Sequence, residues 1–170
     1  MADSDDSKHL YSTVDRSSLA NPSEAVSTNI KLEWDIDFDK QTITGSVEHI
    51  VKVVANGAAH VDFDSAKINI IGEVLVNGEK GTYTAAPAHE VLGTKLSVDI
   101  PAELRVEGTH FTVLFNYSIN TDASAMQWLP ASATKGLKYP YLFTQSQAIH
   151  ARSLMPCQDS PGIKTQYTAR

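Results

Sequence analysis

The sequence predicts an all-β domain made of antiparallel sheets joined by short turns. Three observations indicate this fold class. Hydrophobic and polar residues alternate over several long stretches, no window shows a sustained helical period, and turn-forming pairs such as Asn77-Gly78 separate the stretches. The chain has 170 residues, of which 42% are hydrophobic and 20% charged, and this is enough for one domain with a packed core.

The first alternating stretch is NIKLEWDIDF, residues 29–38. Its apolar residues at every second position are Ile30, Leu32, Trp34, Ile36 and Phe38. Charged residues fill four of the positions between them, so this stretch is expected to be a half-buried strand. DKQT, residues 39–42, makes a turn, and ITGSVEHIVKVV, residues 43–54, returns as the second strand.

Further strands are predicted along the rest of the chain. Their ranges are 61–65, 68–76, 96–101, 110–119, 139–145 and 163–170. Asn77-Gly78 marks a hairpin, since both residues tolerate a positive φ, and GTYT, residues 81–84, is expected to continue that hairpin. Residues 120–138 break the alternation and are expected to form a loop.

We expect different structures at the two ends of the chain. Residues 1–27 are rich in Ser, Asp, Ala and Asn, and we expect them to form a flexible N-terminal arm. Residues 28–170 form the predicted β domain. The last strand stops at Arg170 without a turn or a polar tail. This indicates a domain that is incomplete at its C-terminal end and belongs to a longer protein.

Charge and cysteine content restrict the partners and the location. The chain has 14 Lys and Arg against 20 Asp and Glu, a net charge of −6. Nucleic acid and anionic membranes need a basic face, so neither is an expected partner. No apolar run is long enough to span a membrane, and the opening MADSDDSK lacks the apolar core of a signal peptide. The single cysteine cannot form an internal disulfide, which favours a reducing, cytoplasmic setting.

The segment FTQSQAIHARSLMPCQDSPG, residues 143–162, gathers the side chains that could carry chemistry. His150 and Cys157 could form a base and a nucleophile, since a loop can bridge their separation. Together with Asp159 they could supply three metal ligands. Neither possibility has the tight paired spacing of a specific motif.

A structural corner is the favoured interpretation of residues 151–162. The two prolines of MPCQDSP fix φ and stiffen the chain. Asp159 can cap turn amides, and Arg152 can pair with it. Cys157 is then expected to be a small buried residue.

The two glutamines of this segment are not explained by a corner. On a strand, Gln145 and Gln147 share one face with Phe143. Such a pair can simply be solvated, or it can act as a donor and acceptor set for the polar end of a bound peptide.

His89-Glu90 looks like the start of a zinc-binding HExxH motif. That motif needs two histidines four residues apart on a helix, so that both face one metal. Position 93 is glycine, and the stretch lies between predicted strands. We therefore expect a surface loop and no metal site.

The stretch PYLFTQSQAIHARSLMPCQDSPGIKTQYTA closely resembles a segment of leukotriene A4 hydrolase and its aminopeptidase relatives, a family of zinc metallopeptidases. The shared pattern is an aromatic residue, Gln, an acid or Gln, Ala, then Arg and a Pro-Cys-x-Asp-x-Pro run. QSQAIHAR, with glutamine at position 147, is similar to the leukotriene A4 hydrolase branch. SLANP, DFDKQTITG, AMQWL and YPYLF also fit that branch, so the resemblance covers roughly residues 17–170.

The resemblance implies a saddle-like antiparallel β-sheet domain, the N-terminal domain of the family, here truncated. It implies that Gln147 lines the substrate cleft and contacts the free amino end of a bound peptide. Ala148 would line the same pocket, and Gln145 would be a nearby cleft residue. No catalytic residue and no metal ligand is implied in this chain. The HExxH motif, the distant glutamate ligand and the GxMEN-type motif of the family belong to a second domain, the catalytic zinc domain, which is absent here.

The implied function is that of the N-terminal substrate-cleft domain of a zinc aminopeptidase. The whole protein would remove N-terminal residues from peptides, and hydrolysis of a lipid epoxide is an option in this branch. Zinc would be its cofactor, but this chain alone would bind none and be inactive, because a metal-activated water is the nucleophile of this reaction class. The alternative is a non-catalytic β-sandwich that binds a partner through a sheet face or an unpaired edge strand.

Overall fold

The computed structural model describes residues 15–170 and shows an all-β fold. In this part of the chain the strands form three sheets. The helical elements there are three short 3-10 turns: η2 (Ala102–Leu104), η3 (Ala131–Ala133) and η4 (Ala151–Ser153). No helix of the described residues is long and apolar enough to cross a membrane.

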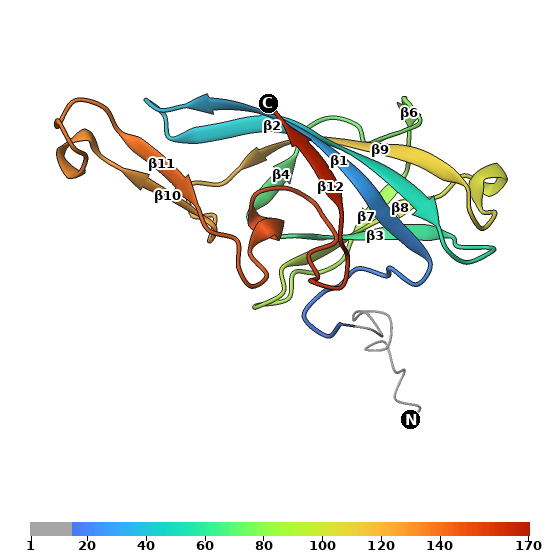
Figure 1. Cartoon of the computed structure of the whole chain (residues 1–170). Helices are drawn as coiled ribbons and strands as arrows, with labels where there is room; N and C mark the ends of the chain where they lie inside the picture. The colour runs from blue at the N-terminus through green and yellow to red at the C-terminus, as the bar shows by residue number, and fades with distance from the viewer. Residues whose placement is uncertain (1–14) are drawn as a thin grey trace.

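The largest sheet has seven strands in the order β12-β1-β2-β9-β5-β6, and β4 pairs with β9 off this path. Its strands are β1 (Ala25–Asp37), β2 (Thr42–Val53), β4 (Ile68–Ile70), β5 (Leu75–Val76), β6 (Glu79–Lys80), β9 (His110–Ile119) and β12 (Gln166–Ala169). Figure 1 shows the long, twisted strands β1, β2 and β9 side by side. Their pairing is antiparallel, whereas β12 runs parallel to β1 at the edge.

Two smaller sheets complete the fold. One contains β3 (His60–Ser65), β8 (Thr94–Asp99) and β7 (Tyr83–Ala85) in the order β3-β8-β7. The other is a hairpin of β10 (Met126–Leu129) and β11 (Tyr141–Thr144), which projects to the left in Figure 1.

The core lies between the large sheet and the three-stranded sheet. The alternating residues of β9 confirm the predicted period: Phe111, Val113, Phe115, Tyr117 and Ile119 are all buried. Phe63 of β3 meets the Phe115 ring edge-on, with 5.2 Å between the ring centroids. The two sheets therefore share one apolar layer, which is the main source of stability in such a fold.

The first predicted strand is confirmed, but only part of its apolar face is buried. Ile30 and Leu32 are buried, whereas Ile36 and Phe38 are 38% and 43% exposed. These two residues lie at the far end of the β1–β2 hairpin, outside the buried core cluster. Phe38 instead meets Trp128 of the β10–β11 hairpin edge-on at 5.5 Å.

Three other details of the predicted strands are wrong. The strand expected over 68–76 is divided into β4 and β5, with Gly72 between them at a φ of 69°. GTYT extends the Asn77-Gly78 hairpin only at Gly81, whose N–H donates to the carbonyl of Val74, because β7 then pairs with β8 in the other sheet. The loop expected over 120–138 contains β10, which is too short to show a clear period by itself.

The flexible arm expected over residues 1–27 is wrong from residue 15 onward, and its first 14 residues lie outside the described part. Leu19 is 3% exposed and Ala20 is fully buried. The Ser18 hydroxyl and the Leu19 N–H each donate a 2.6 Å hydrogen bond to the carboxylate of Asp64. A buried acceptor thus holds a polar segment that carries no apolar period, and β1 already begins at Ala25.

Candidate functional site

The predicted glutamines lie on a short arch, residues 145–150, which we call the glutamine arch. It begins where β11 ends at Thr144 and leads into η4. The expectation that Gln145 and Gln147 continue the strand beside Phe143 is therefore wrong, and residues 147–150 form a turn. The peptide bond between Gln147 and Ala148 is cis.

The first foot of the glutamine arch is held by the loop before β10. The N–H of Gln145 donates to the carbonyl of Ala125 at 2.8 Å, and the N–H of His150 donates to the carbonyl of Ser146 at 2.9 Å. Ser124 Oγ and His150 Nδ1 lie 2.7 Å apart, which joins the same loop to the end of the arch.

The second foot is held by the buried side chain of Ser153. Its hydroxyl donates to the carbonyl of His150 at 2.8 Å and accepts the Ala125 N–H at 3.1 Å. Both feet of the arch therefore meet at Ala125.

The tip of the arch is open to a ligand. Gln145, Gln147 and Ala148 are all exposed. The side-chain amide groups of Gln145 and Gln147 make no hydrogen bond to any described residue of the chain. Each amide can both donate and accept, so the tip presents unused polar groups on a backbone that is fixed at both ends.

The segment after the arch is a structural corner, and the predicted pairing within it is confirmed. Asp159 Oδ2 accepts the Arg152 side-chain Nε–H at 3.0 Å and its backbone N–H at 3.1 Å. The Asp159 N–H in turn donates to Asp64 Oδ2 at 2.9 Å. Asp64 is fully buried, and burial raises the pKa of its carboxyl, while the nearby Arg152 charge and the hydrogen bonds oppose this shift.

Cys157 is part of this scaffold and not a nucleophile. It is 4% exposed, and burial raises the pKa of its thiol well above the usual value. Its backbone forms a two-way bridge with Asp64, with N–H to O distances of 2.7 and 3.0 Å. A thiol nucleophile needs access and a lowered pKa, so the structure gives no support to the alternative of His150 and Cys157 as base and nucleophile.

Metal ligation finds no support in the same region. Among the described residues, no three His, Cys, Asp or Glu side chains gather closely enough to hold a metal ion. His89 and Glu90 lie in an exposed loop between β7 and β8, as predicted. Nδ1 of His89 accepts the backbone N–H groups of Val91 and Leu92, each at 3.1 Å, so this ring closes the loop.

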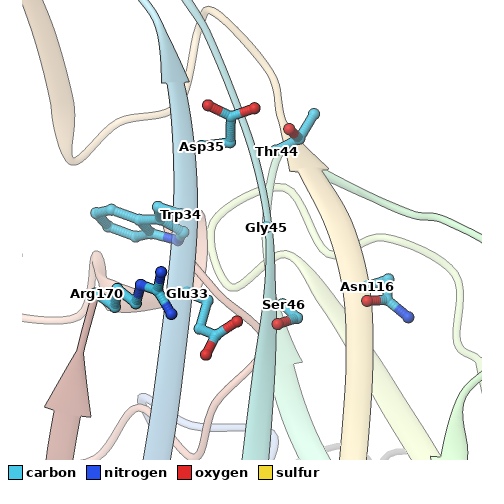
Figure 2. A pocket seen from close by; sticks show the side chains of 8 residues that line it. All are labelled: Glu33, Trp34, Asp35, Thr44, Gly45, Ser46, Asn116 and Arg170. Carbon is cyan, nitrogen blue, oxygen red and sulfur yellow. The ribbon is translucent and has the colours of Figure 1, made fainter.

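Two hollows lie away from the tip of the arch. One, of about 590 Å³, lies between the His89 loop and the arch and is lined by Ile149 and His150 among others. The other, of about 380 Å³, lies on the outer face of the large sheet. Figure 2 shows it lined by polar side chains of neighbouring strands, among them Glu33, Ser46 and Asn116.

Sequence reasoning missed the residues that hold the arch. Ser124 lies in a stretch predicted to be a loop, and Ser153 carries no motif. Ser124 contacts His150 and Ser153 contacts Ala125, which lie 26 and 28 residues away, so no local pattern could have identified these two serines.

This chain is similar to known proteins over most of its length. The model of the family described as "Peptidase M1 N-terminal domain" matches residues 26–170. Leucine aminopeptidase 2 of Aspergillus fumigatus is 35% identical over 151 residues, which cover 88% of this chain and 24% of that protein. The chain therefore spans about a quarter of the length of such a relative.

Solved structures show the same fold. Yeast LTA4 hydrolase in complex with bestatin matches with a TM-score of 0.81 and 32% identity, over 91% of this chain and 24% of that chain. The M1 zinc metallopeptidase from Deinococcus radiodurans matches with a TM-score of 0.61 and 13% identity, over 86% and 32% of the two chains. The second match supports the fold alone.

Proposed function

We propose, because the chain belongs to the peptidase M1 N-terminal domain family, that it forms one wall of the substrate cleft in a zinc aminopeptidase of the leukotriene A4 hydrolase branch. The whole protein would remove N-terminal residues from peptides. Hydrolysis of a lipid epoxide is a further activity to test in this branch. We also propose that the protein acts in the cytoplasm, in keeping with its single, unpaired cysteine.

The exposed tip of the glutamine arch is the observation that carries this proposal. Gln147 presents an unused amide at a fixed position, and its carbonyl oxygen suits the ammonium group of a peptide's free amino end. Ala148 adds little bulk beside it, so the first side chain of a peptide has room. Gln145, at the first foot of the glutamine arch, would supply a second polar contact.

Zinc does not fit the residues of this chain. The described part holds no ligand cluster, so no step of the reaction is assigned to these residues. In the proposed arrangement another domain holds the metal, and zinc supplies an activated water there. The chain alone is expected to release no amino acid from peptides, with or without added zinc.

The test is to replace Gln147 by Leu in a protein that joins this domain to a catalytic domain. Loss of a hydrogen bond to a charged amine should raise KM for short peptides roughly tenfold, with a smaller effect on kcat. Gln127→Leu is the matched control, since Gln127 is also exposed but lies on β10, outside the arch. Equal KM values for Gln147→Leu and the unchanged protein would exclude the proposed role.

A second candidate is a non-catalytic binding module, and the outer sheet face favours it. A polar row of Glu33, Ser46 and Asn116 crosses β1, β2 and β9 beside the hollow of Figure 2. β12 is the edge strand next to this face and is exposed along its whole length. Such an edge can accept a strand from a partner.

Sequencing of the coding region beyond Arg170 separates the two candidates. An HExxH motif in the following domain supports the aminopeptidase. A stop codon directly after Arg170 supports the binding module.

A further inference from the structure

We infer that Arg152 is a positioning residue for the glutamine arch, which it locks to the N-terminal segment, the His89 loop, β3 and the corner. The importance of this for substrate depends on the function proposed above, but the positioning itself can be measured on the chain alone.

The Arg152 side chain is only 3% exposed and is surrounded by acceptors. Nη1 donates to the carbonyl of Leu92 at 2.9 Å, and Nη2 donates to the carbonyl of Ser17 at 2.7 Å. Nε and Nη2 bond the Asp159 carboxylate and carbonyl, at 3.0 and 3.2 Å. Asp64 Oδ1 lies 3.5 Å from Nη1. The group thus joins the N-terminal segment, the His89 loop, β3 and the corner.

These contacts reach the arch through η4. Arg152 and Ser153 are neighbours in this turn, and the Ser153 N–H donates to the carbonyl of His150 at 2.9 Å. The Ser153 hydroxyl then bonds both the end of the arch and Ala125, on which the first foot rests. Arg152 therefore fixes the point from which both feet of the arch are held.

Arginine is required here because its planar group carries five donors in a fixed fork. The four segments present their acceptors in different directions around it. Lysine offers a single ammonium on a flexible stem, so it cannot serve the Leu92 and Ser17 carbonyls and Asp159 together. A charge-conserving change to lysine should therefore release the arch while keeping a cation beside Asp64.

Amide hydrogen exchange on the full chain tests this inference. We compare Arg152→Lys with Arg105→Lys, in which the same change affects a half-buried arginine whose Nε donates to Ile100 away from the arch. For Arg152→Lys, the amides of Gln145 and His150 should exchange roughly tenfold faster or more, the effect of losing at least one charged hydrogen bond. Amides in the centres of β2 and β9 should change far less. Arg105→Lys should leave the arch amides unchanged.

Two results would overturn the inference. One is unchanged exchange at the arch in Arg152→Lys. The other is equal acceleration at the arch and in β2 and β9, which would show a loss of global stability alone. Ser153→Ala provides a second variant in case Arg152→Lys does not fold, because it cuts the link between η4 and Ala125 without disturbing the guanidinium. The same local acceleration is expected in it, and its absence would count against the inference.

The link to substrate has its own measurement. In a protein that contains a catalytic domain, Arg152→Lys should raise KM for peptides more than it lowers kcat. If Gln147→Leu weakens turnover and Arg152→Lys does not, the positioning role is overturned while the proposed function stands. If neither variant affects KM, the proposed function fails, and hydrogen exchange still decides whether Arg152 positions the arch.

Discussion

Nε2 of His49, in the middle of β2, lies 3.0 Å from the carbonyl oxygen of Pro156, 107 residues further along the chain. A carbonyl only accepts, so Nε2 carries the proton and donates. Nδ1 is then free to accept the hydroxyl of Ser27, which lies 3.1 Å away. The neutral ring is therefore satisfied on both sides, and it joins the large sheet to the corner that follows the glutamine arch.

The burial of His49 predicts a loss of stability in mild acid. Desolvation lowers the pKa of its ring from 6.5 to about 4 in the folded chain, although the Pro156 carbonyl opposes this shift. Between these two values the unfolded chain binds the proton and the folded chain does not. The free energy of unfolding should therefore fall as the pH drops from 7 toward 4, by roughly 3 kcal/mol from this residue. Urea unfolding at several pH values measures it.

His49→Gln is the control for this pH dependence. Glutamine can occupy the site but does not titrate, so the variant should be less stable at pH 7 and should lose less stability than the unchanged chain on acidification. The difference between the two chains removes the contribution of the carboxyl groups, including Asp64. Identical pH slopes in both chains would show that His49 does not cause the effect.

Cys157 should resist alkylation in the folded chain. Its thiol is buried, and burial raises its pKa. The reagent therefore cannot reach the sulfur easily, and little of the thiol is ionised to the reactive thiolate. With iodoacetamide near neutral pH, labelling should be at least about a hundredfold slower than in denaturant, since reaction requires local opening. Mass spectrometry follows the label. Rapid labelling of the native chain would contradict the scaffold role and reopen the case for a reactive thiol.

The sequence was most informative where a long period or a special backbone angle decided the structure. β9 matches the predicted range because five inward residues alternate without interruption. The turn at Asn77-Gly78 was predicted from two residues that tolerate a positive φ, and their φ values are 50° and 81°. Both signals are local, and neither depends on a distant partner.

The strand β10, the packing of the N-terminal segment and the glutamine arch could not be predicted, because each depends on residues that are distant in the sequence. β10 has four residues and is defined by pairing with β11 across a 3-10 turn. The N-terminal segment is polar and is fixed by Asp64, which lies 45 residues away from Leu19. At the candidate site, the resemblance predicts a role for Gln147, and this stays a prediction. The arch and the serine residues that hold it depend on contacts that no sequence period encodes.

Tyr117→Phe should destabilise the chain through Trp34. The Tyr117 hydroxyl accepts the indole N–H of Trp34 at 2.8 Å on the inner side of the β1–β2–β9 sheet. The variant leaves this half-buried N–H without its acceptor, which should cost about 1 to 2 kcal/mol of unfolding free energy in urea. Tyr139→Phe is the control, since Tyr139 is 68% exposed. Equal stability of the Tyr117 and Tyr139 variants would show that the hydrogen bond contributes nothing.

Gly45→Ala should lower the free energy of unfolding by more than the addition of one methyl group suggests. A Cβ at this position would lie 2.1 Å from the carbonyl oxygen of Glu33 and 2.7 Å from the Trp34 ring. The first neighbour is backbone in the adjacent strand β1, so it cannot move without disturbing the β1–β2 ladder. We expect a loss of about 2 to 3 kcal/mol of unfolding free energy.

Gly162→Ala is the matched control for this change. The nearest atom to a Cβ at Gly162 is the hydroxyl of Ser160 at 3.6 Å, an ordinary contact, and the position has no positive φ. Urea unfolding of the two alanine variants should therefore separate them clearly, with Gly162→Ala close to the unchanged chain. Equal midpoints would mean that β1 and β2 can move apart freely at Gly45.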